Sequence, residues 1–199
     1  MTDPADPMSD IDSETYRETL VAKRAEKDQF FADHPQSPIP PEDREDFEGL
    51  AYFEPDPDYR VDTTVSLVDD PEADPVAIET SAGREMRYLR VATLAFDLER
   101  ADPELEDGQY ELAAYSQDGG LRTLFVPFRD KTTGQQSYRG GRYMELAVEG
   151  DIEDGDDLLV DFNLAYSPFC AFSETFDCPL PPEENWLEVA IPAGEKAPE

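Results

Sequence analysis

The sequence is short of basic residues. Lysine and arginine together number 16 among 199 residues, against 48 aspartates and glutamates, which gives a formal net charge of -32. Proteins that bind phosphates need clustered basic side chains, so this balance argues against nucleic acids and anionic membranes as partners. No apolar run approaches the roughly 18 residues that a membrane-spanning helix requires. The first ten residues also lack the basic and apolar regions of a secretion signal, so we expect a cytoplasmic protein.

Histidine and cysteine are scarce as well. The one histidine, His34, lies far along the sequence from the two cysteines, Cys170 and Cys178, whereas a structural zinc site needs four such ligands. There is no P-loop, no G-x-S-x-G and no H-E-x-x-H motif, and the acidic run at 151–157 lacks the terminal glutamate of an EF-hand loop. We therefore predict no metal and no cofactor, and we expect His34 to be solvated at the end of a helix.

The acidic excess is itself informative. At low salt, so much like charge on a compact surface destabilises the folded state, and halophilic proteins carry it because salt screens the repulsion. In 1 M salt the Debye length is only about 3 Å. Hydrophobic residues at 39% and aromatic residues at 11% are enough for a core and too many for a disordered chain. We expect a soluble protein from a halophile that accumulates salt in its cytoplasm.

Turn signals and composition divide the chain into two parts. Residues 1–46 carry an acidic N-terminus, a helix and a proline-rich connector, and residues 47–199 are expected to form a single β-rich domain. Ser9 or Ser13 could cap the helix, which we expect to run to about Ala32, shortly before four prolines.

Short segments of alternating apolar and polar residues predict strands from residue 59 onward. The expected strands are 59–67, 76–80, 86–98, 109–115, 121–128, 142–148, 158–162 and 186–191. The D-G-G sequence at 118–120 is typical of a hairpin turn. About eight short antiparallel strands favour a mainly β fold, either a sandwich or a partly closed barrel, with one N-terminal helix.

Polar residues with possible binding roles gather in the C-terminal third. Arg142 follows two glycines, where the backbone can approach another group closely, and its guanidinium can bind a carboxylate or phosphate. Alternatively, Arg142 forms a buried ion pair with Asp161. Asp161 and Asn163 lie two apart on an expected strand and therefore share a face. That polar face is either a satisfied core network or the floor of a pocket.

Further candidates flank these three. Tyr143 and Tyr166 carry hydroxyls on rigid apolar rings. Asn185 follows the extended C-P-L-P-P-E-E segment and either lines a pocket or bonds to loop backbone. Glu195 either pairs with an arginine or stays solvated. The predicted ligand-binding set is Arg142, Tyr143, Asp161, Asn163, Tyr166, Cys170, Asn185 and Glu195.

The cysteines are spaced C-x7-C across a turn-rich loop. The favoured interpretation is two buried thiols that pack as small hydrophobic groups beside Phe169, Phe172 and Phe176. The spacing allows a disulfide between the two cysteines, but a reducing cytosol argues against one. A nucleophilic Cys170 would need a neighbouring base or cation to lower its pKa, and no histidine accompanies it.

The same third of the chain resembles an uncharacterised family of bacterial and haloarchaeal proteins, known only as a domain of unknown function. The shared motifs are F-x-D-x-T-x-G, Y-x-x-G-R-Y, D-F-N-x-A-Y-x-P-x-C-A, C-P-x-P-P-x-E-N and A-G-E. Here they fall on Phe128–Gly134, Tyr138–Tyr143, Asp161–Ala171, Cys178–Asn185 and Ala193–Glu195. One departure is Ser167, where the family often has asparagine. The resemblance implies membership and no activity.

Three functions remain open at this stage. The leading hypothesis is a β domain that binds a small molecule in a polar pocket, with Arg142 holding an anionic group. The second is an enzyme that uses Asp161 or Glu195 as general acid or base, or Cys170 as nucleophile. The third is a protein-interaction module that presents an apolar patch around Phe169, Phe176 and Trp186. The reaction, the ligand and the oligomeric state stay open.

Overall fold

The computed structural model describes residues 12–99 and 108–198. The chain divides into two compact units, Met1–Leu50 and Ala51–Glu199, and each is described by itself. Within the described residues, no helix has the length and apolar character needed to cross a membrane.

The N-terminal unit is built on one helix, α1 (Ser13–Asp33). Asp12 caps it, because its carboxylate accepts hydrogen bonds from the backbone N–H groups of Glu14 and Thr15 at 3.0 and 3.1 Å. The prediction that Ser13 caps the helix was therefore wrong, and Ser9 lies outside the described residues. A carboxylate at this position also interacts favourably with the helix dipole, which a hydroxyl does not.

The helix ends at the only histidine. His34 adopts an extended backbone conformation, and its ring stacks on Phe30 with a centroid distance of 4.5 Å. Its Nδ1 accepts a hydrogen bond from the Gln36 backbone at 3.1 Å. His34 therefore stabilises the exit of α1, and prolines in the following segment keep the helix from continuing.

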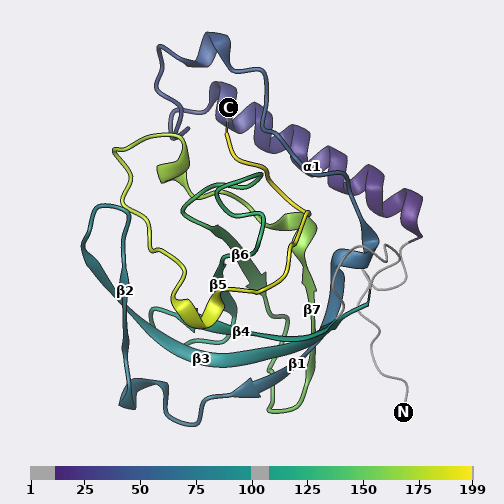
Figure 1. Ribbon diagram of the computed structural model, residues 1–199, viewed down its shortest axis with the longest axis vertical. Helices are drawn as coiled ribbons and strands as arrows, with labels where there is room; N and C mark the ends of the chain where they lie inside the picture. The colour runs from purple at the N-terminus through teal and green to yellow at the C-terminus, as the bar shows by residue number, and fades with distance from the viewer. Residues whose placement is uncertain (1–11, 100–107, 199) are drawn as a thin grey trace. The chain divides into compact units, whose positions relative to one another are not determined.

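The second unit is one antiparallel sheet of seven strands within the described residues. They are β1 (Arg60–Leu67), β2 (Val76–Glu79), β3 (Glu85–Leu98), β4 (Gly108–Ser116), β5 (Thr123–Phe128), β6 (Arg142–Ala147) and β7 (Asp157–Asp161). The order is β6-β5-β4-β3-β1-β7, and β2 pairs with the first part of β3. The sheet curls into a half-barrel (Figure 1), which confirms the predicted fold class and decides for the partly closed barrel over the sandwich.

Strand β3 is what allows this curvature. It is 14 residues long, and its first part pairs with β2. A register shift between Arg90 and Ala92 interrupts its pairing with β4. Such a bulge bends a strand and increases its local twist. The same long strand can therefore leave β2 and continue between β4 and β1.

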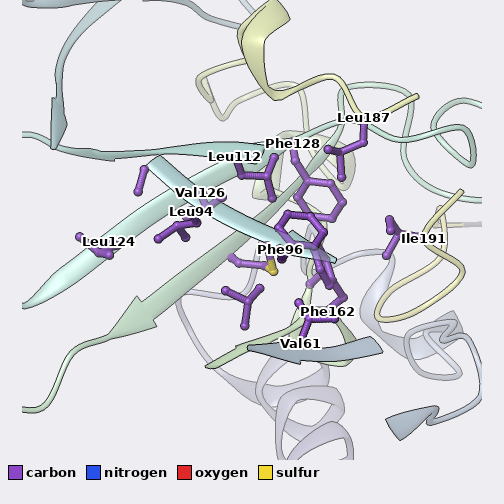
Figure 2. Close-up of a cluster of buried hydrophobic side chains, with 14 of the residues drawn as sticks. Val61, Leu94, Phe96, Leu112, Leu124, Val126, Phe128, Phe162, Leu187 and Ile191 are labelled. Carbon is purple, nitrogen blue, oxygen red and sulfur yellow. The ribbon is translucent and has the colours of Figure 1, made fainter. Parts of the chain in front are cut away.

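The core lies on the inner face of the curved sheet. Figure 2 shows side chains from β1, β3, β4 and β5 meeting Phe162, Leu187 and Ile191. The alternation predicted for β1 holds, because Val61, Thr63 and Val65 are buried and the residues between them are exposed. Apolar residues at every second position therefore set the inner face, as the pleat of a strand requires.

The eighth expected strand, at 186–191, is absent. This segment has one isolated parallel bridge, between Arg129 and Trp186, and otherwise irregular backbone. Leu187, Val189 and Ile191 are nevertheless buried. The C-terminal segment lies over the hollow side of the sheet (Figure 1), so its alternating apolar residues fill the core without joining a ladder. The pattern was read correctly as burial and wrongly as a strand.

Candidate functional site

Arg142, the first residue of β6, is completely enclosed by protein. Its Nη2 lies 3.3 Å from Oδ1 of Asp130, which is also buried. The expected ion pair with Asp161 does not form, because Asp161 instead lies 3.6 Å from Nε of Arg60. Burial lowers the pKa of the Arg142 guanidinium, and the Asp130 carboxylate opposes that shift. A paired buried charge of this kind costs far less than an isolated one.

The rest of the Arg142 guanidinium holds the C-terminal segment. Nη1 donates to the carbonyls of Ala193 and Glu195, the latter at 3.1 Å, and Nη2 donates to the carbonyl of Ile191 at 2.8 Å. Four of its five N–H donors are thus used inside the protein, and Nε alone lacks a partner. Arg142 fastens residues 191–195 to β6 and leaves no donor directed at solvent.

Asn185 performs a similar task between two strands. Strands β4 and β5 pair only at Tyr115 and Phe125. Two residues further along, the Asn185 side chain accepts from the N–H of Ala113 at 2.7 Å and donates to the carbonyls of Ala113 and Pro127 at 2.9 and 2.7 Å. Its amide therefore replaces the ladder bonds that the two strands lose as they separate.

Asp161 and Asn163 do lie together, though not on one strand. Strand β7 ends at Asp161, and Asn163 belongs to a short 3-10 turn, Phe162–Leu164. Oδ1 of Asp161 accepts from the backbone and side-chain nitrogens of Asn163, both at 3.0 Å. The Asn163 amide also bonds to both backbone groups of Asp56, at 2.9 and 2.7 Å. The pair links the end of β7 to the segment that precedes β1.

The Glu195 side chain is buried, and its carboxylate is hydrogen-bonded to a backbone N–H group. Its Oε2 accepts from the N–H of Ser167 at 2.8 Å, and its own N–H donates to Ala165 at 2.9 Å. The preceding residue, Gly194, has φ of +79°, and a Cβ there would stand 2.5 Å from the Ala165 carbonyl oxygen. Glycine is therefore required for the close approach that brings Glu195 to Ser167.

The two tyrosines pack against each other. The rings of Tyr143 and Tyr166 meet edge to face at 5.8 Å, and the Tyr143 hydroxyl donates to the Pro179 carbonyl. Burial raises the pKa of both phenols. The glycine pair before Arg142 serves packing too, because a Cβ on Gly141 would stand 2.6 Å from Pro181. What the backbone approaches there is the proline-rich segment.

The predicted residues thus fall into two groups. All eight form hydrogen bonds or ring contacts within the protein. Cys170 alone of the eight also lines a surface cavity of about 390 Å³. We name this depression the Cys170 cavity. Its described lining includes Gly134, Gln135, Ser137, Tyr138, Arg139, Cys170, Phe172, Ser173 and Glu174.

The polar groups of the Cys170 cavity come from two loops. Tyr138 and Arg139 precede β6, whereas Cys170 lies on the short 3-10 turn Phe169–Ala171. The Tyr138 hydroxyl lies 3.8 Å from Sγ of Cys170. Burial and the contact with Cys170 raise the pKa of Tyr138 to about 12, so its proton stays available for donation. Arg139 is exposed and is the one cation among the described lining residues.

Both cysteines are free thiols in this structure, and both are half-buried rather than buried as the sequence-based interpretation expected. The segments that carry the two thiols meet through the edge-to-face contact between the rings of Phe169 and Phe176 at 5.2 Å. The hydrogen bond from Cys178 lowers the pKa of Cys170 to about 6, with smaller contributions from the Tyr138 and Ser81 hydroxyls. The same contact raises the pKa of Cys178. The cation and base that sequence reasoning looked for are thus replaced by hydroxyl and thiol donors.

Two residues of importance escaped the sequence-based set. Asp130, the true partner of Arg142, stands in F-R-D-K-T-T-G, and Arg139 stands in Y-R-G-G-R-Y. Both motifs were visible, but Asp130 and Arg142 are brought together by the pairing of β5 with β6, which the sequence did not reveal. Among the described residues, no three His, Cys, Asp or Glu side chains gather closely enough to hold a metal ion.

A second depression, of about 630 Å³, lies elsewhere on the same unit. Four carboxylates, from Asp62, Asp97, Glu111 and Glu188, contribute to its lining together with Trp186. Trp186 is 45% exposed, and the Arg129 guanidinium stacks 4.8 Å above its ring. This acidic surface is unsuited to an anion.

Comparison with known proteins identifies the family of the chain. A family model described as "Protein of unknown function (DUF1684)" matches residues 45–196. The chain belongs to this family. The DUF1684 region covers all of the motifs above. The chain is also similar to an uncharacterized protein of Haloarcula marismortui solved by solution NMR, with 58% sequence identity, 92% of this chain and 95% of that chain covered, and a TM-score of 0.69.

No curated protein matches the chain. The similar structure comes from a haloarchaeon. The halophilic interpretation of the net charge of -32 stays a prediction for this DUF1684 member.

Proposed function

We propose that the β unit, Ala51–Glu199, binds a small molecule with an anionic group at the Cys170 cavity. The observation that carries the proposal is the cavity itself, where Arg139 stands beside Gln135, Ser137, Tyr138 and Ser173. Ligand sites combine a concave surface with a few converging polar groups of this kind. Glu174 is the one acidic side chain among the described lining residues.

The overall negative charge does not prevent this. A net charge of -32 repels anions at low ionic strength, but in 1 M salt that field decays within about 3 Å. An anion in direct contact with the Arg139 guanidinium lies inside that range. Arg142 fixes the backbone at 191–195, and Glu195 fixes Ser167, three residues before Cys170.

The test is a binding measurement in molar KCl with inorganic phosphate and succinate as probes. Isothermal titration should detect saturable binding by the reduced protein, and Arg139→Gln should weaken it at least tenfold, because the substitution removes the cation that contacts the probe. Arg87→Gln is the matched control, since Arg87 is also exposed and lies outside the cavity lining. Equal weakening by both substitutions, or no binding of either probe, would contradict the proposal.

A further inference from the structure

Two different parts of the fold fix the positions of the two thiols. Cys178 is anchored to the turn after β2, because its N–H donates to the Ser81 hydroxyl at 3.1 Å and its carbonyl accepts from the Ser81 N–H at 2.9 Å. Cys170 is placed by the 3-10 turn Phe169–Ala171, beside the ring contact between Phe169 and Phe176 at 5.2 Å. Their proximity is therefore built by tertiary structure, since seven residues separate them in sequence.

The surroundings of the two sulfurs differ. Cys170 lines the open cavity and has the Tyr138 hydroxyl 3.8 Å away, which can donate a hydrogen bond to a thiolate. Cys178 follows Asp177, whose carboxylate opposes ionisation of its thiol. The thiolate is therefore favoured on Cys170, the sulfur that lines the cavity. Thiolate, rather than thiol, is the reactive form of cysteine.

We propose that Cys170 and Cys178 are a redox pair in which a hydroperoxide oxidises Cys170 first and Cys178 then closes a disulfide. This goes beyond the proposed binding function and does not depend on it. The inference rests on the adjacency of the two thiols, their different exposure to the cavity and the hydroxyl donor beside one of them.

The chemistry balances with hydroperoxide as the oxidant. The Cys170 thiolate attacks the outer peroxide oxygen, the O–O bond breaks, and the departing oxygen takes a proton from solvent to leave as water or alcohol. Cys170 is then a sulfenic acid. The Cys178 thiol gives up its proton and attacks the Cys170 sulfur, and hydroxide leaves and is protonated to water. Two thiols lose two electrons and two protons in total, and the peroxide is reduced.

Closing the bond requires the sulfurs to approach to about 2 Å. The disulfide would join the Phe169–Ala171 turn to the segment that is hydrogen-bonded to Ser81, and it would convert the Cys170 thiol beside Tyr138 into an uncharged disulfide sulfur. Oxidation therefore alters the part of the Cys170 cavity lined by Cys170, whereas Arg139, which lies on another loop, is chemically unchanged.

The experiment is oxidation of the reduced full chain by stoichiometric hydrogen peroxide in molar KCl, followed by intact-mass and peptide mass spectrometry with dimedone as a sulfenic-acid trap. The wild-type protein should lose the mass of two hydrogen atoms, link the Cys170 and Cys178 peptides, and take up no dimedone. Cys178→Ser should take up one dimedone, on Cys170. Cys170→Ser should keep its remaining thiol reduced at the same dose.

Three results would overturn the inference: no oxidation at a dose that oxidises free cysteine, dimedone on Cys178 in Cys170→Ser as fast as on Cys170 in Cys178→Ser, or a wild-type protein that stops at sulfenic acid. Circular dichroism establishes that each variant is folded. If a variant does not fold, mapping of the wild-type protein at limiting peroxide, with dimedone present, still identifies the first cysteine oxidised. Phosphate binding is measured on reduced protein, so failure of the redox pair and failure of the binding site are separate results.

Discussion

At the scale of single residues, Arg142 combines a charge with complete burial. The buried guanidinium is paired with Asp130 and bonded to three backbone carbonyls. Removing it leaves the Asp130 carboxylate charged, buried and without its cation. Removing one partner of a buried pair typically costs about 3–5 kcal/mol.

We therefore expect Arg142→Met to lower the free energy of unfolding by about 3–5 kcal/mol. The measurement is denaturant unfolding in molar KCl, with Arg87→Met as the matched control because Arg87 is exposed on β3. The control should change stability by no more than about 0.5 kcal/mol. A loss for Arg142→Met as small as that of the control would show that the guanidinium is not a structural fastener.

Cys170 supplies a prediction about pH. Because Cys178 lowers its pKa to about 6, Cys170 is mostly thiolate at neutral pH and is protonated as the pH falls through 6. Its alkylation rate by iodoacetamide should therefore reach half of its maximum near pH 6, below the usual value of about 8.5 for a free cysteine. Peptide mass spectrometry separates its reaction from that of Cys178.

The same pH profile of alkylation tests whether Cys178 causes the lowered pKa of Cys170. Cys178→Ala removes the largest contribution to the lowered pKa, so the midpoint should move toward 8.5, and Tyr138→Phe should move it upward by less. The groups near the thiols are Tyr138, Ser81, Tyr88, Tyr143, Tyr166 and Asp177. Tyr110→Phe, on β4, is the control. A midpoint that stays fixed in Cys178→Ala would contradict the proposed contact between the thiols.

At the scale of elements, one side chain completes the sheet. Asn185 occupies the place where a further pair of β4 and β5 residues would bond. Asn185→Ala leaves one N–H and two carbonyls without this partner, and each unsatisfied buried group costs about 1–3 kcal/mol. Hydrogen exchange at β4 and β5 amides should accelerate more than at β1, and the free energy of unfolding should fall by several kcal/mol.

The control for this substitution is Gln136→Ala, which removes an amide from an exposed position. Comparable effects of the two substitutions would mean that β4 and β5 do not depend on the Asn185 side chain.

Elements also differ in how far the sequence could predict them. Strands β1 to β7 were found because alternation and turn residues are local properties, and β1 shows the alternation in its burial. The segment at 186–191 shows the same alternation, yet it crosses the core without strand neighbours. Periodicity reports which side chains are buried, whereas a ladder requires a partner that only the tertiary fold supplies.

The site was predictable to a smaller extent for the same reason. The sequence identified the polar residues that matter structurally, but it paired Arg142 with Asp161, because partners 12 and 19 residues away look alike without strand order. Asp130 reaches Arg142 only because β5 and β6 are neighbours. Cys170 was the one member of the predicted set that lines the cavity. Arg139, which also lines it, stands in the Y-R-G-G-R-Y motif, but only Arg142 and Tyr143 of that motif were selected from the sequence.

At the scale of the whole molecule, charge decides the conditions under which the fold persists. The screening length falls from about 10 Å at 0.1 M salt to about 3 Å at 1 M. Because the chain carries a net charge of -32, we expect its thermal midpoint to rise steadily as KCl increases from 0.1 to 1 M. Differential scanning calorimetry measures this rise, and a midpoint independent of KCl would contradict the halophilic interpretation of the charge.

The central claim is that the polar motif residues are scaffold and that ligand chemistry belongs to the Cys170 cavity. The most direct test is an NMR titration of the ¹⁵N-labelled protein with inorganic phosphate in molar KCl. The account predicts saturable shifts at the backbone amides of Gly134, Gln135 and Ser173, which line the cavity. Shifts concentrated instead at Ile191, Ala193 and Glu195, around the Arg142 guanidinium, would contradict it.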